Sequence, residues 1–260
     1  LNATGDREGV RLENGRVRPA AGFSDAYKAF ADGGWNGLSA ALEHGGQGLP
    51  KALELAVFEC IHAANMSFGL CPLLTQGAIE ALAEHGSADL KAAYLPKLVS
   101  GTWTGTMNLT EPQAGSDLSL VRAQARPAGD GSYRIRGEKI YITWGEHDMT
   151  DNIVHLVLAR LPDAPEGVRG ISLFLAPKVL PGADGRLGQA NALRCGGIEH
   201  KLGIHASPTC TMLFEDATGW LVGQPHQGLA HMFTMMNAAR LNVGCQGVGI
   251  AERAYQQALG

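Results

Sequence analysis

The apolar side chains in the first hundred residues follow the spacing of helices. In Lys51–Met66 they recur every three or four positions, which predicts an amphipathic helix with one apolar face toward the core: Leu53, Ala56, Val57, Cys60, Ile61 and Ala64. Three more helices are expected, two of them with serine N-caps: residues 24–32 after Ser24, residues 71–85, and residues 87–98 after Ser87. The pattern therefore predicts a helical N-terminal domain over residues 1–102.

After Gly101 the chain changes to short runs rich in β-branched and aromatic residues, separated by Gly, Pro and Asp turns. The predicted strands cover residues 103–110, 120–125, 133–143, 153–159, 171–176 and 210–214. Few helices alternate with these runs, so we expect an antiparallel barrel or sandwich over residues 103–225. Helical spacing returns at Gly228 and predicts a helix in residues 226–260. The predicted fold class is α+β with several domains.

Composition excludes some classes of function. The net charge of −4, with no block of Lys or Arg, gives no basis for nucleic-acid binding. The five cysteines are scattered without a CxxC pair, which favours a reducing, cytoplasmic location over a disulfide framework. No apolar run approaches the roughly 20 residues of a membrane helix. The chain opens on Leu1 and still has a helical pattern near Gly260, so we expect a piece of a longer polypeptide.

The segment Leu109–Asp117 holds the strongest candidate chemistry. It directly follows a predicted strand and combines hydroxyls, a carboxylate and small residues in one loop. Small residues let backbone N–H groups approach an anion such as a nucleotide pyrophosphate. Taken alone, such a loop could equally be a surface turn capped by Ser116 and Asp117.

The sequence pattern that singles out this loop extends to other segments of the chain. Leu109–Asp117 reads Leu-Thr-Glu-Pro-Gln-Ala-Gly-Ser-Asp and resembles the T-E-P-x-A-G-S-D signature of the acyl-CoA dehydrogenase family, with its preceding aliphatic residue, at every fixed position. Four further segments resemble family motifs and occur in family order: Gly137–Thr143, Lys201–Ser207, Phe214–Asp216 and Gly228–Arg240. Chance explains one such match, not five.

The resemblance implies an FAD-binding protein with an N-terminal helical domain, a middle antiparallel β-barrel and a C-terminal four-helix bundle. Residues 226–260 would be the first helix of that bundle, and the flavin would lie between barrel and bundle. The residues implied to contact the flavin are Met107, Leu109, Thr110, Gly115, Ser116, Tyr141, Ile142 and Thr143. Backbone and hydroxyl donors suit this cofactor because reduced flavin develops negative charge.

The resemblance implies different roles for the residues that would contact the flavin. Leu109 and Thr110 would meet the pyrimidine end of the flavin ring, and Thr143 would lie near the reactive N5. Gly115 and Ser116 would serve the pyrophosphate. Met107 would contact the ring, and Tyr141 would add an aromatic face worth about 1 kcal/mol beyond its buried area.

The implied reaction is the α,β-dehydrogenation of an acyl-CoA, in which a carboxylate removes the α-proton and a hydride passes to the flavin. Ser116, Asn237 and Arg240 would contact the substrate. No glutamate before Gly260 fits the family base, so we assign no catalytic residue and expect the base outside this chain. We therefore expect the chain alone to be inactive or unstable. The family further implies an electron-transfer flavoprotein as acceptor and a homodimer or homotetramer at full length.

Several positions depart from the family pattern. Tyr141 replaces the usual tryptophan, Trp144 a smaller polar residue, His205 an arginine and Asn237 an acid. The long stretch Pro181–Gly197, with the glycine-rich segments 5–9 and 46–50, resembles the larger subgroup that acts on 3-methylthiopropanoyl-CoA.

Two other functions remain open. An acyl-CoA oxidase would share the flavin motifs but pass electrons to oxygen, and a non-catalytic relative would bind flavin and DNA. A metal site is not expected, since Glu59 and His62 form a single E-x-x-H pair without a second. The segment Gly244–Gly249 has glycines in a G-x-x-G-x-G pattern after a helix, which indicates close helix packing rather than a dinucleotide loop.

Overall fold

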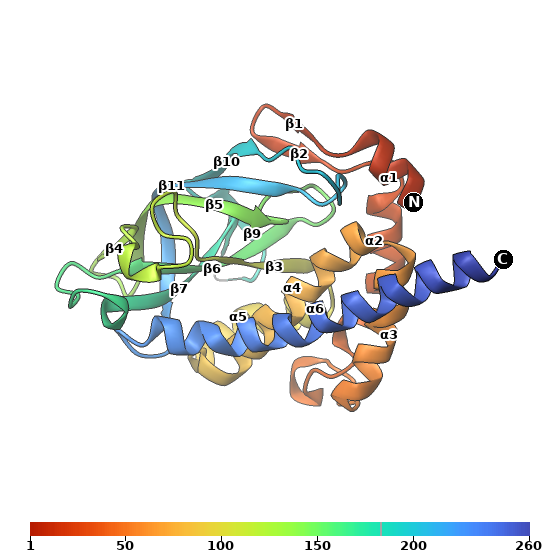
Figure 1. The fold of residues 1–260 in the computed structure, drawn as a ribbon. Coiled ribbons are helices and arrows are strands. Elements are labelled where there is room, and N and C mark those ends of the chain that lie inside the picture. Colours follow the sequence, from red (N-terminus) through yellow and green to blue (C-terminus); the bar gives the residue numbers. More distant parts are fainter. Residues whose placement is uncertain (183) are drawn as a thin grey trace.

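The computed structural model describes residues 1–182 and 184–260. Figure 1 shows the strands gathered on one side of the molecule and helices on the other, with the C-terminal helix running along both. The helices before residue 102 are α1 (Asn2–Glu8), α2 (Phe23–Asp32), α3 (Lys51–Ala64), α4 (Met66–His85) and α5 (Ala88–Val99). The predicted helical N-terminal domain is confirmed, and a hairpin of β1 (Arg11–Glu13) and β2 (Arg16–Arg18), which the sequence pattern does not predict, interrupts it.

Helix ends differ from the prediction where a different residue provides the cap. α2 begins at Phe23 after Gly22, whose left-handed backbone starts the helix, rather than at Ser24. α4 begins five residues before the predicted Cys71 because Asn65 caps it, with Oδ1 accepting from the Phe68 N–H at 3.0 Å. The Ser87 cap of α5 is confirmed by a 3.3 Å hydrogen bond from the Leu90 N–H.

α3 packs on the protein through a face that only partly overlaps the predicted one, with Ile61 at the shared edge. Leu53 is 47% exposed and Cys60 is also exposed, whereas Glu54, Phe58 and His62 are buried. Burial of Glu54 is tolerated because Lys51 and Ser39 bind its carboxylate, and burial lowers the pKa of His62 to about 4, which leaves its ring neutral. Periodicity found the helix but could not foresee that these polar groups would face α4 and α6.

The main sheet has seven strands: β3 (Trp103–Asn108), β4 (Gln124–Pro127), β5 (Tyr133–Thr143), β6 (Asn152–Arg160), β7 (Ile171–Pro177), β10 (Leu193–Ile198) and β11 (Thr209–Val222). The purely antiparallel arrangement is wrong, because β3–β6 and β4–β6 are parallel. The pairings β11–β5–β4–β6–β7–β11 form a ring, but only the pair Gln124–Arg160 joins β4 to β6. The sheet is therefore mixed, and the barrel stays a prediction.

The long segment 181–197 contains part of a small separate hairpin, β8 (Val179–Pro181) and β9 (Leu187–Ala190), and the start of β10. Residue 183 lies outside the described residues.

The last helix, α6 (Gly228–Leu259), joins the two halves by packing on β7, α4 and α3. Close packing is confirmed at Gly249, where a Cβ would lie 2.9 Å from the Glu59 carbonyl oxygen. It is wrong at Gly244 and Gly247, which face open space. Within the described residues, no helix combines the length and apolar character needed to cross a membrane. The domain boundaries at residues 102 and 225 stay predictions.

Candidate flavin site

The ends of β3 and β5 bring together the two most specific motif segments. The Ile140 N–H donates to the Thr110 carbonyl at 2.9 Å, and the Thr106 hydroxyl donates to the Thr143 carbonyl at 2.7 Å. These bonds cross-link the loop after β3 to the last residues of β5. Met107, Leu109 and Thr110 therefore lie beside Tyr141 and Thr143, although some 30 residues of chain separate them.

A buried ion pair fixes this junction. The Lys139 ammonium lies 2.7 Å from the Glu111 carboxylate, and both side chains are almost fully buried. Glu111 also accepts from the backbone N–H groups of Arg122 and Ala123, at 2.7 and 3.0 Å. Burial opposes ionisation of Glu111, but the Lys139 charge and these hydrogen bonds together hold its pKa below the ordinary value. The carboxylate is therefore ionised and anchors the loop from inside.

Lys139 also sets the direction of a peptide group. Its ammonium donates to the Leu109 carbonyl at 3.0 Å. Because a trans peptide directs its C=O and N–H to opposite sides, this bond turns the Thr110 N–H away from the protein interior. The Thr110 and Thr143 hydroxyls have no hydrogen-bond partner within residues 1–182 and 184–260. This edge thus offers donors to a ligand.

The glycine-rich loop has the properties of an anion cradle. A bridge between Glu111 and Ala114 closes its base, and Gly115, Ser116 and Asp117 are exposed. A side chain at Gly115 would meet no atom within 4 Å. Among the described residues, no group accepts a hydrogen bond from the Gly115 or Ser116 N–H. Adjacent free amides of this kind suit a phosphate.

A bulge in β5 exposes Tyr141. Lys139 pairs with Met212 and Ile142 with Cys210, so two residues of β5 stand opposite Thr211 alone. Tyr141 has φ +59° and is 59% exposed, an unusual combination for an aromatic residue in a strand. The ring is available to a planar ligand. The Ile142 side chain points the other way, into the core, so only its backbone could contact a cofactor.

Trp144, the residue after Thr143, anchors the end of β5 in the core. It is buried, stacks on Phe23 with ring centroids 6.5 Å apart, and donates from Nε1 to the Ser67 carbonyl at 3.2 Å. The residue that departed from the family pattern therefore ties the end of β5 to α2 and α4. Its φ of +52° adds a second left-handed residue next to Thr143.

The inner side of β3 is polar and uncharged. Thr104 contacts His147 Nε2 at 2.9 Å, and Asn108 contacts His155 Nδ1 at 3.2 Å. Burial lowers the pKa of both histidines to about 3, so both rings are neutral near neutral pH.

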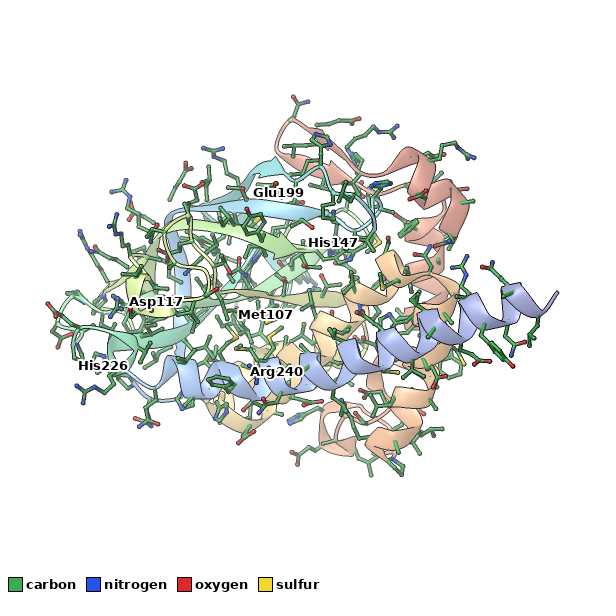
Figure 2. All side chains as sticks on the ribbon, viewed as in Figure 1. Met107, Asp117, His147, Glu199, His226 and Arg240 are labelled. Carbon is green, nitrogen blue, oxygen red and sulfur yellow. The ribbon has the colours of Figure 1, made fainter. Side chains whose placement is uncertain are left out.

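Two of the three residues implied to contact substrate, Asn237 and Arg240, lie on another element. Asn237 and Arg240 are exposed on α6, where Arg240 donates to Asn237 Oδ1 at 2.9 Å and its guanidinium lies 5.2 Å from the Phe233 ring. Figure 2 shows Met107 on β3 and Arg240 on α6, with Asp117 at the glycine-rich loop. Met107 packs at the edge of the core shared with α6, but no hydrogen bond of the described residues links Arg240 to the β3 loop.

Glu111 and Lys139 were not recognised as a pair from the sequence, although both stand inside the motifs. The alternation of Ile135, Gly137 and Lys139 puts Lys139 on the inner face, and a buried lysine requires an anion. No group of three metal-binding side chains occurs in the described part of the chain, and Glu59 and His62 gain no third ligand.

Comparison with known proteins covers the whole chain. Residues 11–102 match the acyl-CoA dehydrogenase N-terminal domain, and residues 106–217 match the middle domain. The chain is 61% identical to 3-methylmercaptopropionyl-CoA dehydrogenase of Ruegeria pomeroyi, over 100% of this chain and 44% of that protein. It therefore spans less than half of that relative.

Solved structures agree in fold. Butyryl-CoA dehydrogenase from Megasphaera elsdenii matches with a TM-score of 0.81 at 25% identity, over 98% of this chain and 62% of that one. Acyl-CoA dehydrogenase complexed with FAD from Bacillus anthracis matches with a TM-score of 0.73 at 27% identity, over 89% and 37%. The chain belongs to the acyl-CoA dehydrogenase family.

Proposed function

We propose that this chain forms the FAD-binding part of an enzyme that oxidises the α,β bond of an acyl-CoA thioester. The observation that carries the proposal is the junction of the two motif segments, which the Lys139–Glu111 pair holds together and where several donors have no partner among the described residues. When bound, FAD supplies the hydride acceptor. The described residues hold and orient the ring and its phosphates.

The chemical types of these donors and their order along the chain suit the successive parts of FAD. Thr110 would donate from its N–H and hydroxyl to the pyrimidine end of the flavin, and Thr143 would donate near N5 from the neighbouring strand. Gly115 and Ser116 would bind the pyrophosphate through their free amides. Tyr141 would cover one face of the ring, where dry contact excludes water.

The relative's name suggests 3-methylmercaptopropionyl-CoA as the first substrate to test. We infer that Ser116, Asn237 and Arg240 contribute to acyl-CoA binding, with Asn237 acting through hydrogen bonds alone. No glutamate of this chain is assigned as the base. An electron-transfer flavoprotein is the proposed acceptor, and a cytoplasmic location and a homodimeric or homotetrameric state stay predictions.

Anaerobic flavin reduction tests the proposal. The protein at full length, loaded with FAD, is mixed with 3-methylmercaptopropionyl-CoA, and the visible flavin band is followed. Bleaching is expected with the thioester and not with free CoA. Absence of bleaching with this and straight-chain acyl-CoA substrates would contradict the proposal. Fast reoxidation by air would favour an oxidase, and salt-dependent DNA retention without bleaching would favour the flavin- and DNA-binding alternative.

A further inference from the structure

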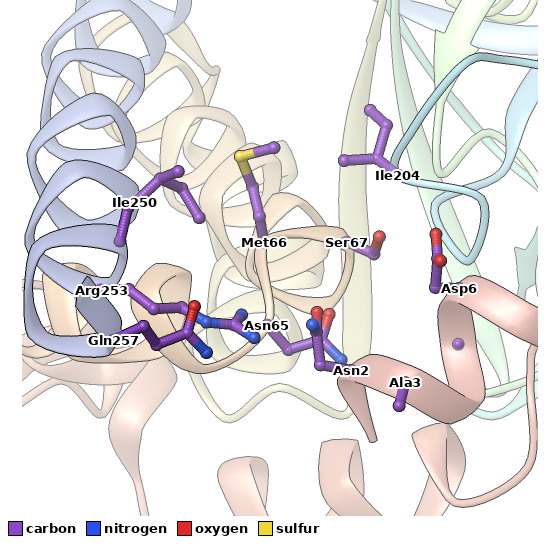
Figure 3. A pocket seen from close by; sticks show the side chains of 12 residues that line it. Asn2, Ala3, Asp6, Asn65, Met66, Ser67, Ile204, Ile250, Arg253 and Gln257 are labelled. Carbon is purple, nitrogen blue, oxygen red and sulfur yellow. The ribbon is translucent and has the colours of Figure 1, made fainter. Parts of the chain in front are cut away.

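A pocket lined by none of the proposed flavin-binding residues lies between α1, the start of α4, the end of α6 and the loop before β11. It has a volume of about 500 Å³, which is within the range of small-molecule sites. Figure 3 shows its polar side, where Arg253 of α6 reaches toward Asn65 and Asn2. Met66, Ile204 and Ile250 line the apolar side.

Asn65 is the unusual residue of this pocket. It is 7% exposed, and its Oδ1 caps α4 by accepting from the Phe68 N–H. Its Nδ2 is buried and has no partner within the described residues. A buried amide donor without an acceptor is costly, so an acceptor from a ligand would stabilise this arrangement.

The start of α4 supplies more donors at the same place. Phe68 and Gly69 donate to the Asn65 side chain and carbonyl, which leaves the N–H groups of Met66 and Ser67 without partners inside the helix. α4 has 20 residues, so its N-terminus also carries the partial positive charge of a long helix. Both residues line the pocket.

Arg253 adds a full positive charge. Its Nη1 donates to the Ala63 carbonyl at 3.2 Å, and the Asn2 amide, with its oxygen turned toward α6, accepts from Nη1 and Nη2 at 3.2 and 3.0 Å. Guanidinium has five N–H donors, so donors remain after these contacts. The one carboxylate of the lining, Asp6, lies on the opposite side, with Oδ1 2.9 Å from His205 Nδ1.

We propose that this pocket binds a small organic anion, whose carboxylate or phosphate head is held by Asn65, the start of α4 and Arg253. The apolar side, formed by Met66, Ile204 and Ile250, would contact a short hydrocarbon body. The site is separate from the proposed flavin chemistry and does not depend on it.

Asn65→Asp tests the site without removing the helix cap. Aspartate accepts from the Phe68 N–H as asparagine does, but it replaces the Nδ2 donor by a charged oxygen that repels an anion. Calorimetric titration at constant ionic strength compares butyrate, inorganic phosphate and chloride. One butyrate is expected per chain, bound more tightly than phosphate, with no heat from chloride. Asn65→Asp should weaken butyrate binding by at least about tenfold, the loss of a hydrogen bond to a charged group.

Ser87→Asp is the matched control, since it places the same residue at the N-cap of α5. It should leave butyrate affinity unchanged. Arg253→Gln provides a second variant and should also weaken binding, with circular dichroism confirming that each variant is folded. Absence of butyrate binding, equal or tighter binding of phosphate, or unchanged butyrate affinity in folded Asn65→Asp would each overturn the proposal.

Discussion

Replacing Glu111 by glutamine should destabilise the protein more than the similar size of the two side chains suggests. The glutamine amide would keep the shape and part of the hydrogen bonding but remove the charge 2.7 Å from the Lys139 ammonium. The Lys139 side chain is fully buried, and burial lowers its pKa to about 8 even beside Glu111, so in the variant Lys139 must be buried as an uncompensated charge or give up its proton, and both cost stability. Removing one partner of a buried ion pair costs about 3–5 kcal/mol, a large part of the stability of a typical domain.

A double variant with Lys139→Met and Glu111→Gln removes both charges of the buried ion pair. Once both charges are gone, the interior no longer contains an isolated ion, so the double variant should recover most of the loss. The Leu109 carbonyl would still lose its donor, and FAD affinity should therefore stay low even where stability returns. Recovered stability with low FAD affinity would separate the contribution of the pair to stability from its role in orienting the Leu109 peptide group.

Guanidinium unfolding followed by tryptophan fluorescence measures the free energy of unfolding of Glu111→Gln, of Lys139→Met alone and of the double variant in a double-mutant cycle. Glu215→Gln is the matched control, because the Arg194–Glu215 pair is exposed. It should leave the unfolding midpoint unchanged. A loss below about 1 kcal/mol for Glu111→Gln would refute the reasoning, since it would match an ordinary surface pair.

Further predictions concern pH, helix packing and backbone strain. Folding lowers the pKa of Glu111, so the contribution of its carboxylate to the free energy of unfolding is fully present above the ordinary pKa and is lost as pH falls through the lowered value. The free energy of unfolding of Glu111→Gln should therefore depend less steeply on pH in the acid range. Gly249→Val should cost about 1–3 kcal/mol in thermal unfolding through contact with the Glu59 carbonyl, whereas Gly247→Val, facing open space, should not show this loss. Tyr141→Gly should relieve about 1 kcal/mol or more of strain yet weaken FAD binding in a fluorescence titration; unchanged FAD affinity would exclude Tyr141 from the flavin site.

The sequence predicted those parts of the fold that local pattern determines. β5 has the predicted bounds, residues 133–143, because alternation and flanking turns define a long strand. The β1–β2 hairpin was missed, since two strands of three residues give almost no period. The face of α3 was predicted only in part because pairing with Lys51 and Ser39 allows Glu54 to be buried, a tertiary effect that apolar spacing does not encode.

The candidate site was found by motif and explained by structure. The motif segments drew attention to Thr110 and Thr143, but their proximity depends on hydrogen bonds between β5 and the loop after β3. The bulge that exposes Tyr141 depends on the register with β11, which no single strand reveals. Asn237 and Arg240 remain predictions, since no hydrogen bond of the described residues ties them to the loop after β3.

FAD titration of the full-length protein, followed by quenching of flavin fluorescence, tests the central claim most directly. One FAD should bind per chain. Thr110→Val and Thr143→Val should each weaken binding by about 0.5–1.5 kcal/mol, the net value of a hydrogen bond, whereas the exposed Thr102→Val should not. Absence of FAD binding by the folded full-length protein, or equal effects of all three substitutions, would contradict the placement of the flavin at the junction of β3 and β5.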